Sequence, residues 1–248
     1  VKIKKHYDLY ASLIAGLGGV MSEASVPTLA GPKQKLGTFE EFLARLTGQV
    51  AHFKSYIGDA HSFMATAWHD KKYAFVFEKA QAVGLDNRWG VYPDITASDT
   101  TLAGIFASTE GLVDPEEIEI KAAVIKATYM SSVGIRKLPT LMTGPLADKI
   151  REEAHEYGAT TKRPRDLARI DLPTLTFFRQ VGKPNCLVMT HMDVSYPESP
   201  IEVCVAYTKD GAKTSYRPDQ TFLNTVTPVY KKLPAWDGSE ARKARTIS

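Results

Sequence analysis

The stretch "EYGATTKRPRD", residues 156–166, places hydroxyl groups beside guanidinium groups. Thr160 and Thr161 offer hydroxyls and backbone N–H groups as donors. Arg163 and Arg165 carry rigid forks of donors that fit a carboxylate or a phosphate. Three cations within four residues repel one another, and a bound anion relieves that repulsion. A solvated basic loop is the alternative, but the repulsion favours anion binding.

A second polar loop follows the apolar run 73–78, which is predicted to be a buried strand. Ligands in α/β sheets bind beyond the carboxyl ends of the strands, and Gln81 lies three residues past this run. Its amide can read a donor and an acceptor together, and Thr96 adds a hydroxyl further along. A structural loop that uses these groups for its own turns is an equally good interpretation of the composition.

A third segment, "MTHMDV", places Asp193 at the end of an apolar run. A carboxylate there can accept two parallel N–H bonds, such as those offered by guanine N1–H and N2–H. An Asp at a strand end more often caps a turn, and a lone histidine such as His191 is more often packed than functional. The residues alone therefore favour a structural role for this segment.

The elements that must hold these loops alternate between helical and strand patterns. Asp8, the Thr38–Glu41 capping box, Asp114 and Asp171 are predicted helix starts. The predicted helices cover 6–17, 39–57, 59–70, 115–129 and 172–181, and the predicted strands cover 73–78, 186–194 and 201–208. The alternation predicts an α/β fold with a mainly parallel sheet flanked by helices.

Composition narrows the classes of protein. The 248 residues are 44% hydrophobic and 24% charged, enough for one large domain or two small ones. A net charge of +3 excludes a strongly basic nucleic-acid wrapper. No apolar run approaches the roughly 20 residues of a membrane span. Cys186 and Cys204 lie in apolar runs, which predicts buried free thiols and a cytoplasmic, reducing compartment.

Taken together, the three loops resemble those of adenylosuccinate synthetases. The segment "FEKAQAVGLDNRWGVYPDITASDTT", residues 77–101, is similar to the family's Phe-Glu-Gly-Ala-Gln-Gly motif and the Leu-Asp, Tyr-Pro and Thr-Ser-Ser-Asn-Thr-Thr that follow it. "GATTKRPR", 158–165, is similar to Gly-Ala-Thr-Thr-Gly-Arg, and "THMDV", 190–194, to Thr-Lys-Leu-Asp-Val. The likeness runs from about residue 57 to 236. It implies a P-loop-NTPase-related adenylosuccinate synthetase fold, incomplete at both ends.

The resemblance also implies an activity in purine nucleotide biosynthesis. The family uses GTP and Mg²⁺ to phosphorylate the 6-oxygen of IMP, and the amine of L-aspartate then displaces that phosphate. The implied IMP-binding residues are Gln81, Leu85, Thr96, Val133 and Arg163. The implied aspartate-binding residues are Ala159, Thr160, Thr161, Lys162, Arg163 and Arg165. The implied residues for the nucleoside triphosphate are Arg165, His191 and Asp193. A homodimer is expected, and neither nucleic acid nor a membrane is an expected partner.

Several departures from the family pattern open alternatives. The phosphate loop Gly-Asp-Glu-Gly-Lys-Gly and the C-terminal Ser-Thr-Gly-Pro segment do not occur in residues 1–248, which begin at Val1 and end in the basic, helix-like "SEARKARTIS". We therefore expect an inactive fragment of a single catalytic domain. The catalytic base and the Mg²⁺ ligands are expected in a missing N-terminal segment, with no catalytic or metal-binding residue in this stretch.

Four substitutions and one segment leave the substrate open. Lys79 and Ala82 replace glycines of the Gln81 loop, Lys162 replaces the glycine of the family's aspartate loop, and His191 replaces a lysine. Residues 17–28 also match poorly the family segment that binds the IMP phosphate. One alternative is a viral-type ligase that joins L-aspartate to dGMP, giving 2-aminoadenylosuccinate, with ATP or dATP as the nucleoside triphosphate. The other alternative is a non-catalytic nucleotide-binding paralogue.

Overall fold

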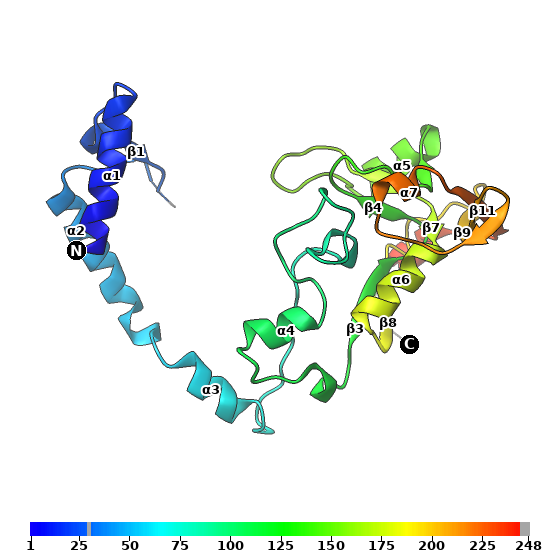
Figure 1. The fold of residues 1–248 in the computed structure, drawn as a ribbon, viewed down its shortest axis with the longest axis horizontal. Helices are drawn as coiled ribbons and strands as arrows, with labels where there is room; N and C mark the ends of the chain where they lie inside the picture. The colour runs from blue at the N-terminus through cyan, green and yellow to red at the C-terminus, as the bar shows by residue number, and fades with distance from the viewer. Residues whose placement is uncertain (29–30, 244–248) are drawn as a thin grey trace. The chain divides into compact units, whose positions relative to one another are not determined.

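The computed structural model describes residues 1–28 and 31–243 of the chain (Figure 1). The chain divides into two compact units, Val1–Phe63 and Met64–Ser248. All three polar loops lie in the second unit. Within the described residues, no helix is both long and apolar enough to cross a membrane.

The first unit, drawn in blue to cyan in Figure 1, is built on two helices and a small hairpin. Its elements are α1 (Lys2–Gly16), η1 (Met21–Glu23), β1 (Ser25–Val26), β2 (Gln34–Lys35), α2 (Phe39–Phe53) and η2 (Lys54–Tyr56). The capping box that begins α2 is confirmed, because the Glu41 N–H donates to Thr38 Oγ1 and the Thr38 N–H donates to Glu41 Oε2. The prediction that Asp8 begins the first helix was wrong: the helix begins at Lys2, and Asp8 pairs with Lys4 inside it.

The second unit contains the remaining elements. Its helices are α3 (Ala60–Ala67, which begins in the first unit), η3 (Val83–Leu85), α4 (Ala103–Ser108), η4 (Pro115–Glu117), α5 (Pro145–Glu153), α6 (Leu172–Gly182), α7 (Gln220–Leu223) and α8 (Gly238–Lys243). Its strands are β3 (Ala122–Lys126), β4 (Met130–Ser132), β5 (Leu141–Met142), β6 (Asp166–Ala168), β7 (Ile170–Asp171), β8 (Cys186–Thr190), β9 (Ile201–Lys209), β10 (Ala212–Thr214) and β11 (Thr227–Leu233). Of the predicted C-terminal helical run, 244–248 lie outside the described residues.

The strands of the second unit form three sheets. Strands β3 and β8 pair in parallel, and β7 pairs in parallel with β9. Antiparallel pairing joins β10 and β11 to β9, and joins β4 and β5 to β6. Helix α6 packs against β9 (Figure 1). The predicted α/β class is confirmed, with antiparallel strands added around the parallel pairs.

Two buried clusters hold this unit together. One lies beneath the β4–β6–β5 sheet and joins Tyr129, Leu167, Ile150 and Val194, among others. The second includes Cys204 and Tyr207 of β9. Because β6 directly follows the arginine-rich loop, the first cluster fixes the base of that loop.

Three local predictions were wrong. Residues 115–129 form a short 3₁₀ turn and then strand β3, not a helix, because residues 122–126 pair with β8. Residues 73–78 are not a strand; Phe75 and Phe77 pack around Trp68, with ring centroids 5.3 and 5.8 Å from it. Cys186 is exposed on β8, whereas Cys204 is buried as predicted, and burial raises the pKa of its thiol to about 11.

Candidate functional site

Residues 156–165 form a narrow hairpin. The Arg165 N–H donates to the Glu156 carbonyl at 2.9 Å, and the Gly158 N–H donates to the Arg163 carbonyl at 2.8 Å. Tyr157 and Pro164 pair across the stem as an antiparallel bridge. The Lys162 N–H turns back to the Gly158 carbonyl at 2.9 Å. These backbone hydrogen bonds therefore fix the conformation of the predicted carboxylate-binding loop without a bound ligand.

The tip of this hairpin is exposed and rich in unused donors. Ala159, Thr160, Thr161 and Lys162 are all exposed, and so is Arg163 just after them. Among residues 1–28 and 31–243, no side-chain partner is found for the Arg163 guanidinium, and the Arg163 N–H makes only a 3.4 Å bond to Thr161 Oγ1. The groups expected to bind a carboxylate are thus available to one.

Arg165 has a different environment from Arg163. Its Nη1 pairs with Glu156 Oε2 at 3.1 Å, and Glu156 is only 1% exposed. The other oxygen of Glu156 accepts hydrogen bonds from Lys126 Nζ and, at 2.6 Å, from Tyr129 Oη. Arg165 Nε is buried and has no partner in the described part of the chain. Arg165 is therefore anchored at the stem of the hairpin.

The charges of this cluster shift its acid–base equilibria. Burial alone would raise the pKa of Glu156, but the hydrogen bonds from Lys126 and Tyr129 and the nearby positive charges outweigh burial and lower that pKa. Burial lowers the pKa of Lys126 despite its pair with Glu156. Burial and the bond to Glu156 raise the pKa of Tyr129. Glu156 is therefore ionised and Tyr129 keeps its proton at neutral pH.

The turn after β8 carries His191 and Asp193. His191 has a left-handed backbone, with φ of +54°, and the Val194 N–H donates to its carbonyl at 3.0 Å. The His191 ring stands edge-on to Tyr129, and its Nδ1 lies 3.1 Å from Tyr129 Oη. Asp193 Oδ2 accepts a 3.4 Å bond from Arg242 Nε of helix α8.

A shallow depression of about 360 Å³ opens beside this turn. Its lining includes Thr190, His191 and Asp193 from the turn and Glu153, Ala154 and His155 from the end of α5. Two of the three residues predicted to contact the nucleoside triphosphate, His191 and Asp193, thus share one concave surface, and Arg165 is not among its lining residues.

Three of the residues predicted to bind IMP, Leu85, Thr96 and Val133, lie in or next to a second loop, whereas Arg163 lies in the hairpin. The Thr96 N–H donates to the Leu85 carbonyl at 2.7 Å, which joins the two parts of the loop. Arg136 Nη1 donates to the Gly84 carbonyl and its Nε to Ser132 Oγ at 2.9 Å, which fastens the loop to the end of β4 just before Val133.

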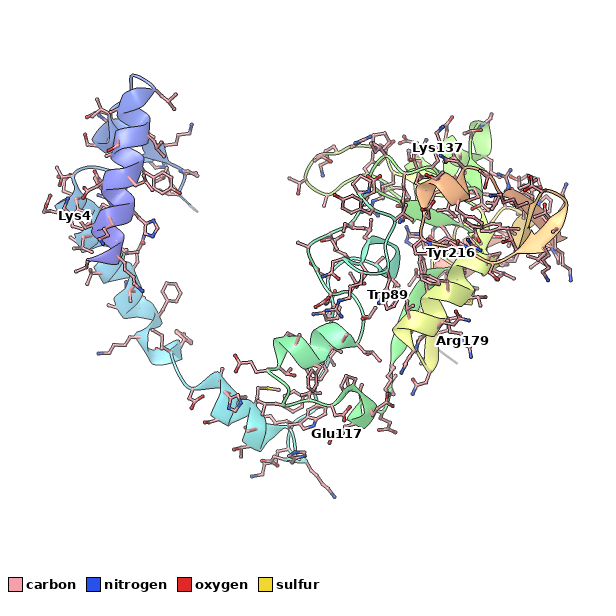
Figure 2. The ribbon with its side chains drawn as sticks, in the orientation of Figure 1. Lys4, Trp89, Glu117, Lys137, Arg179 and Tyr216 are labelled. Carbon is pink, nitrogen blue, oxygen red and sulfur yellow. The ribbon has the colours of Figure 1, made fainter. Side chains whose placement is uncertain are left out.

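Aromatic contacts hold this loop against α6. Trp89 packs edge-on to Phe177 at 6.3 Å between ring centroids, and Phe177 packs on Tyr216 at 5.1 Å. Trp89 and Tyr216 are labelled in Figure 2. Gln81 is exposed at the start of the loop and has φ of +70°.

Strand β4 links the two groups of residues. Tyr129 precedes β4 and Val133 follows it, and the antiparallel register sets Ser132 opposite Asp166. Val133, which directly follows β4, therefore lies near the stem of the hairpin that ends in Arg165. In the described residues, no hydrogen bond joins the Arg163 side chain to Gln81, Leu85, Thr96 or Val133.

Sequence reasoning missed four residues that organise these loops: Lys126, Tyr129, Arg136 and Glu156. Glu156 offered a signal, since it is a carboxylate six residues before the cations that begin at Lys162. The others offered none, because Lys126 and Tyr129 were assigned to a helix and Arg136 lies in an irregular loop.

A divalent metal would need a cluster of oxygen ligands. Within residues 1–28 and 31–243, His, Cys, Asp and Glu side chains do not gather in threes as a metal site requires. The described residues therefore do not fit a Mg²⁺ site, and no chemical step is assigned here to the ion.

Comparison with known proteins agrees with these features. The sequence model of the adenylosuccinate synthetase family matches residues 21–248. An adenylosuccinate synthetase of Limosilactobacillus reuteri is 36% identical over 186 residues, which are 74% of this chain and 42% of that protein. An adenylosuccinate synthetase of Nitratidesulfovibrio vulgaris is 33% identical over 200 residues, 80% of this chain and 45% of that protein.

A solved structure shares the fold. The fully ligated adenylosuccinate synthetase of Plasmodium falciparum superposes with a TM-score of 0.67 at 23% identity, covering 95% of this chain and 64% of that one. The matched region thus spans less than half the length of the two bacterial relatives. The family match itself extends over most of the chain and includes all three loops. The chain belongs to the adenylosuccinate synthetase family.

Proposed function

We propose that the protein carrying this chain joins L-aspartate to a purine nucleotide, IMP, at the expense of GTP, in purine nucleotide biosynthesis. The observation that carries the proposal is the preshaped hairpin tip, where Arg163 follows the exposed Thr160 and Thr161 and its guanidinium has no side-chain partner among the described residues. The relatives in L. reuteri and N. vulgaris bear the name of this activity.

The hairpin suits a small dicarboxylate. Arg163 can bind one carboxylate with two parallel bonds, and the hydroxyls and N–H groups of Thr160 and Thr161 can bind the other. Each end of L-aspartate then has donors, while its amine stays free to react. Fixing the amine in this way lowers the entropic part of the barrier to its attack on an activated purine carbon.

The turn at His191–Asp193 suits a nucleotide base. The Asp193 carboxylate is an acceptor that matches the N1–H and N2–H donors of guanine, and the depression beside it gives the base a surface to lie on. In this proposal Arg242 releases Asp193 when a base binds, because its bond of 3.4 Å joins two partly exposed side chains.

The reaction then follows the family pattern. GTP phosphorylates the 6-oxygen of IMP, and the aspartate amine displaces that phosphate to give adenylosuccinate. Gln81, Leu85, Thr96 and Val133 are proposed to contact the IMP. The dimer, the use of Mg²⁺ and a cytoplasmic location belong to the same proposal and rest on family membership.

The test is an assay of the full-length protein with L-aspartate. IMP and dGMP are compared, each with GTP and with ATP, and the products are separated by chromatography. Adenylosuccinate formation with IMP and GTP is the expected result.

The other outcomes have distinct meanings. Product from dGMP alone would replace IMP by dGMP and retain the ligase. Nucleotide binding without any product would point to the non-catalytic paralogue and overturn the proposed function.

A further inference from the structure

A buried chain of hydrogen bonds joins the two ligand-binding loops. Arg165 at the stem of the hairpin bonds to Glu156 at 3.1 Å, and Glu156 accepts from Tyr129 Oη at 2.6 Å. Tyr129 in turn meets His191 Nδ1 at 3.1 Å. Both middle members are fully buried, with Glu156 1% and Tyr129 0% exposed.

We propose that Glu156 and Tyr129 are positioning residues that couple the two sites, so that a dicarboxylate bound at the hairpin tip tightens the binding of a purine base at the His191–Asp193 turn. This inference rests on the proposed function, which supplies the two ligands. Neither residue touches a ligand in it; each acts through Arg165 or His191.

The number of protons available for these hydrogen bonds determines which nitrogen of His191 acts as the donor. A tyrosine hydroxyl has one proton, and Tyr129 donates it to Glu156. The 3.1 Å contact must then be a bond from His191 Nδ1–H to the Tyr129 oxygen. In the neutral ring, Nε2 is left as an acceptor, and Asp193 lines the same depression as His191. The turn therefore presents two acceptors, which favours a base edge that carries N–H donors.

The same series of hydrogen bonds connects the orientation of His191 to the hairpin. Glu156 Oε2 is used by Arg165, and Oε1 by Tyr129 and Lys126. Because these groups are buried, a displaced partner leaves an unpaired charge or hydroxyl that is costly in a low-dielectric interior. Movement of the hairpin stem therefore displaces the acceptor of the Tyr129 hydroxyl. A ligand that orders the stem from the tip keeps Tyr129, and with it the His191 ring, in place. By thermodynamic linkage the effect must be reciprocal.

The test measures L-aspartate binding by calorimetry, with and without saturating GTP. No IMP or dGMP is present, so no turnover occurs. The full-length protein is compared with Tyr129→Phe, which removes the central hydroxyl. Tyr196→Phe is the matched control, because Tyr196 Oη bonds Glu153 at 2.9 Å near the same depression but outside the chain.

In the wild type, GTP is expected to tighten aspartate binding about fivefold or more, within the usual range of coupling between sites. In Tyr129→Phe the factor should fall below about twofold, while each ligand alone binds within about threefold of wild type. Tyr196→Phe should keep the wild-type factor. A purely structural loss would weaken both ligands and leave the coupling factor unchanged.

The outcomes separate this inference from the proposed function. Wild-type binding of both ligands without coupling, or full coupling in Tyr129→Phe, overturns the inference alone. Absence of binding of either ligand to the wild type overturns both. If Tyr129→Phe does not fold, the alternative variant is His191→Gln, which removes the half-buried imidazole at the end of the series of hydrogen bonds. Retained coupling in that variant contradicts the inference.

Discussion

Lys162 and two other residues of the predicted binding loops have strained backbones. Gln81, Lys162 and His191 all lie in the left-handed region, with φ between +54° and +70°. Non-glycine residues in this conformation are uncommon, and such strain gathers at functional sites. At Lys162 a glycine would adopt this φ without strain.

Replacing Lys162 with glycine should stabilise the protein. Relief of the left-handed strain is worth about 1–2 kcal/mol, and the greater freedom of glycine in the unfolded chain offsets about 0.5–1 kcal/mol of it. Urea unfolding should show a net gain of about 0.5–1 kcal/mol. Lys71→Gly is the control, since Lys71 is an exposed turn residue without positive φ, and it should lose stability. Equal losses in both variants would contradict the strain argument.

Glu156 should govern part of the acid sensitivity. Its pKa is lowered in the folded protein, so the unfolded state takes up a proton first as the pH falls below about 4.3. Stability therefore falls as the pH drops toward the folded pKa. Glu156→Gln should flatten this acid limb in thermal unfolding between about pH 3 and 7. An unchanged acid slope would show that Glu156 is not responsible.

The same variant should be less stable at neutral pH. It leaves Lys126 and Arg165 without their carboxylate. We expect a loss of about 2 kcal/mol, less than the 3–5 typical of a fully buried pair, because both cations keep some exposure.

Helix α6 is held by a cap that also serves the core. Asp171 Oδ1 accepts from the Thr174 N–H at 3.1 Å, and its Oδ2 accepts from the buried hydroxyls of Thr140 and Tyr207. Burial raises the pKa of Asp171 even though these bonds oppose the shift. The exposed cap at Thr38 makes only the local capping box.

The two caps should differ in their contribution to stability. Thr38→Ala should lower the free energy of unfolding by about 1 kcal/mol, the usual value of a cap. Asp171→Ala should lower it by about 2–4 kcal/mol, since it also removes the buried carboxylate that accepts from the Tyr207 and Thr140 hydroxyls. Asp171→Asn should recover part of the loss. Equal effects of the two alanine variants in urea unfolding would contradict a role for Asp171 in the core.

Local signals predicted those elements whose ends are set by their own residues. The cap at Asp171 and the box at Thr38 are examples, because their hydrogen bonds join residues three apart. Residues 122–126 were assigned to a helix because their apolar spacing also fits a helical face. Pairing with β8, more than 60 residues away, decided otherwise, and tertiary pairing routinely overrides local preference.

The candidate site likewise contains residues that local sequence signals predict and residues that only distant contacts define. The hairpin tip was predicted to bind an anion from its own side chains, whereas the His191–Asp193 turn was predicted only through the resemblance to the family, because its residues alone favoured a structural role. Glu156 and Tyr129 act by contact with residues 9 to 62 positions away, which no local pattern reveals.

Across the whole chain, the predicted ligand-binding residues lie in the second unit, Met64–Ser248. The family match begins at residue 21 and therefore includes part of the first unit. Because the matched region covers 42% and 45% of the two bacterial relatives, the complete reaction must be assayed in the full-length protein.

The central claim is that the Arg163 guanidinium binds the dicarboxylate. Full-length protein with Arg163→Leu should be titrated with L-aspartate by calorimetry. Arg179→Leu is the control, because Arg179 is an exposed arginine in the last turn of α6 (Figure 2). Loss of a bidentate charged contact of about 2–3 kcal/mol predicts at least a thirtyfold weaker affinity for Arg163→Leu, against an unchanged affinity for the control. An Arg163→Leu protein that binds L-aspartate as tightly as wild type would contradict the account.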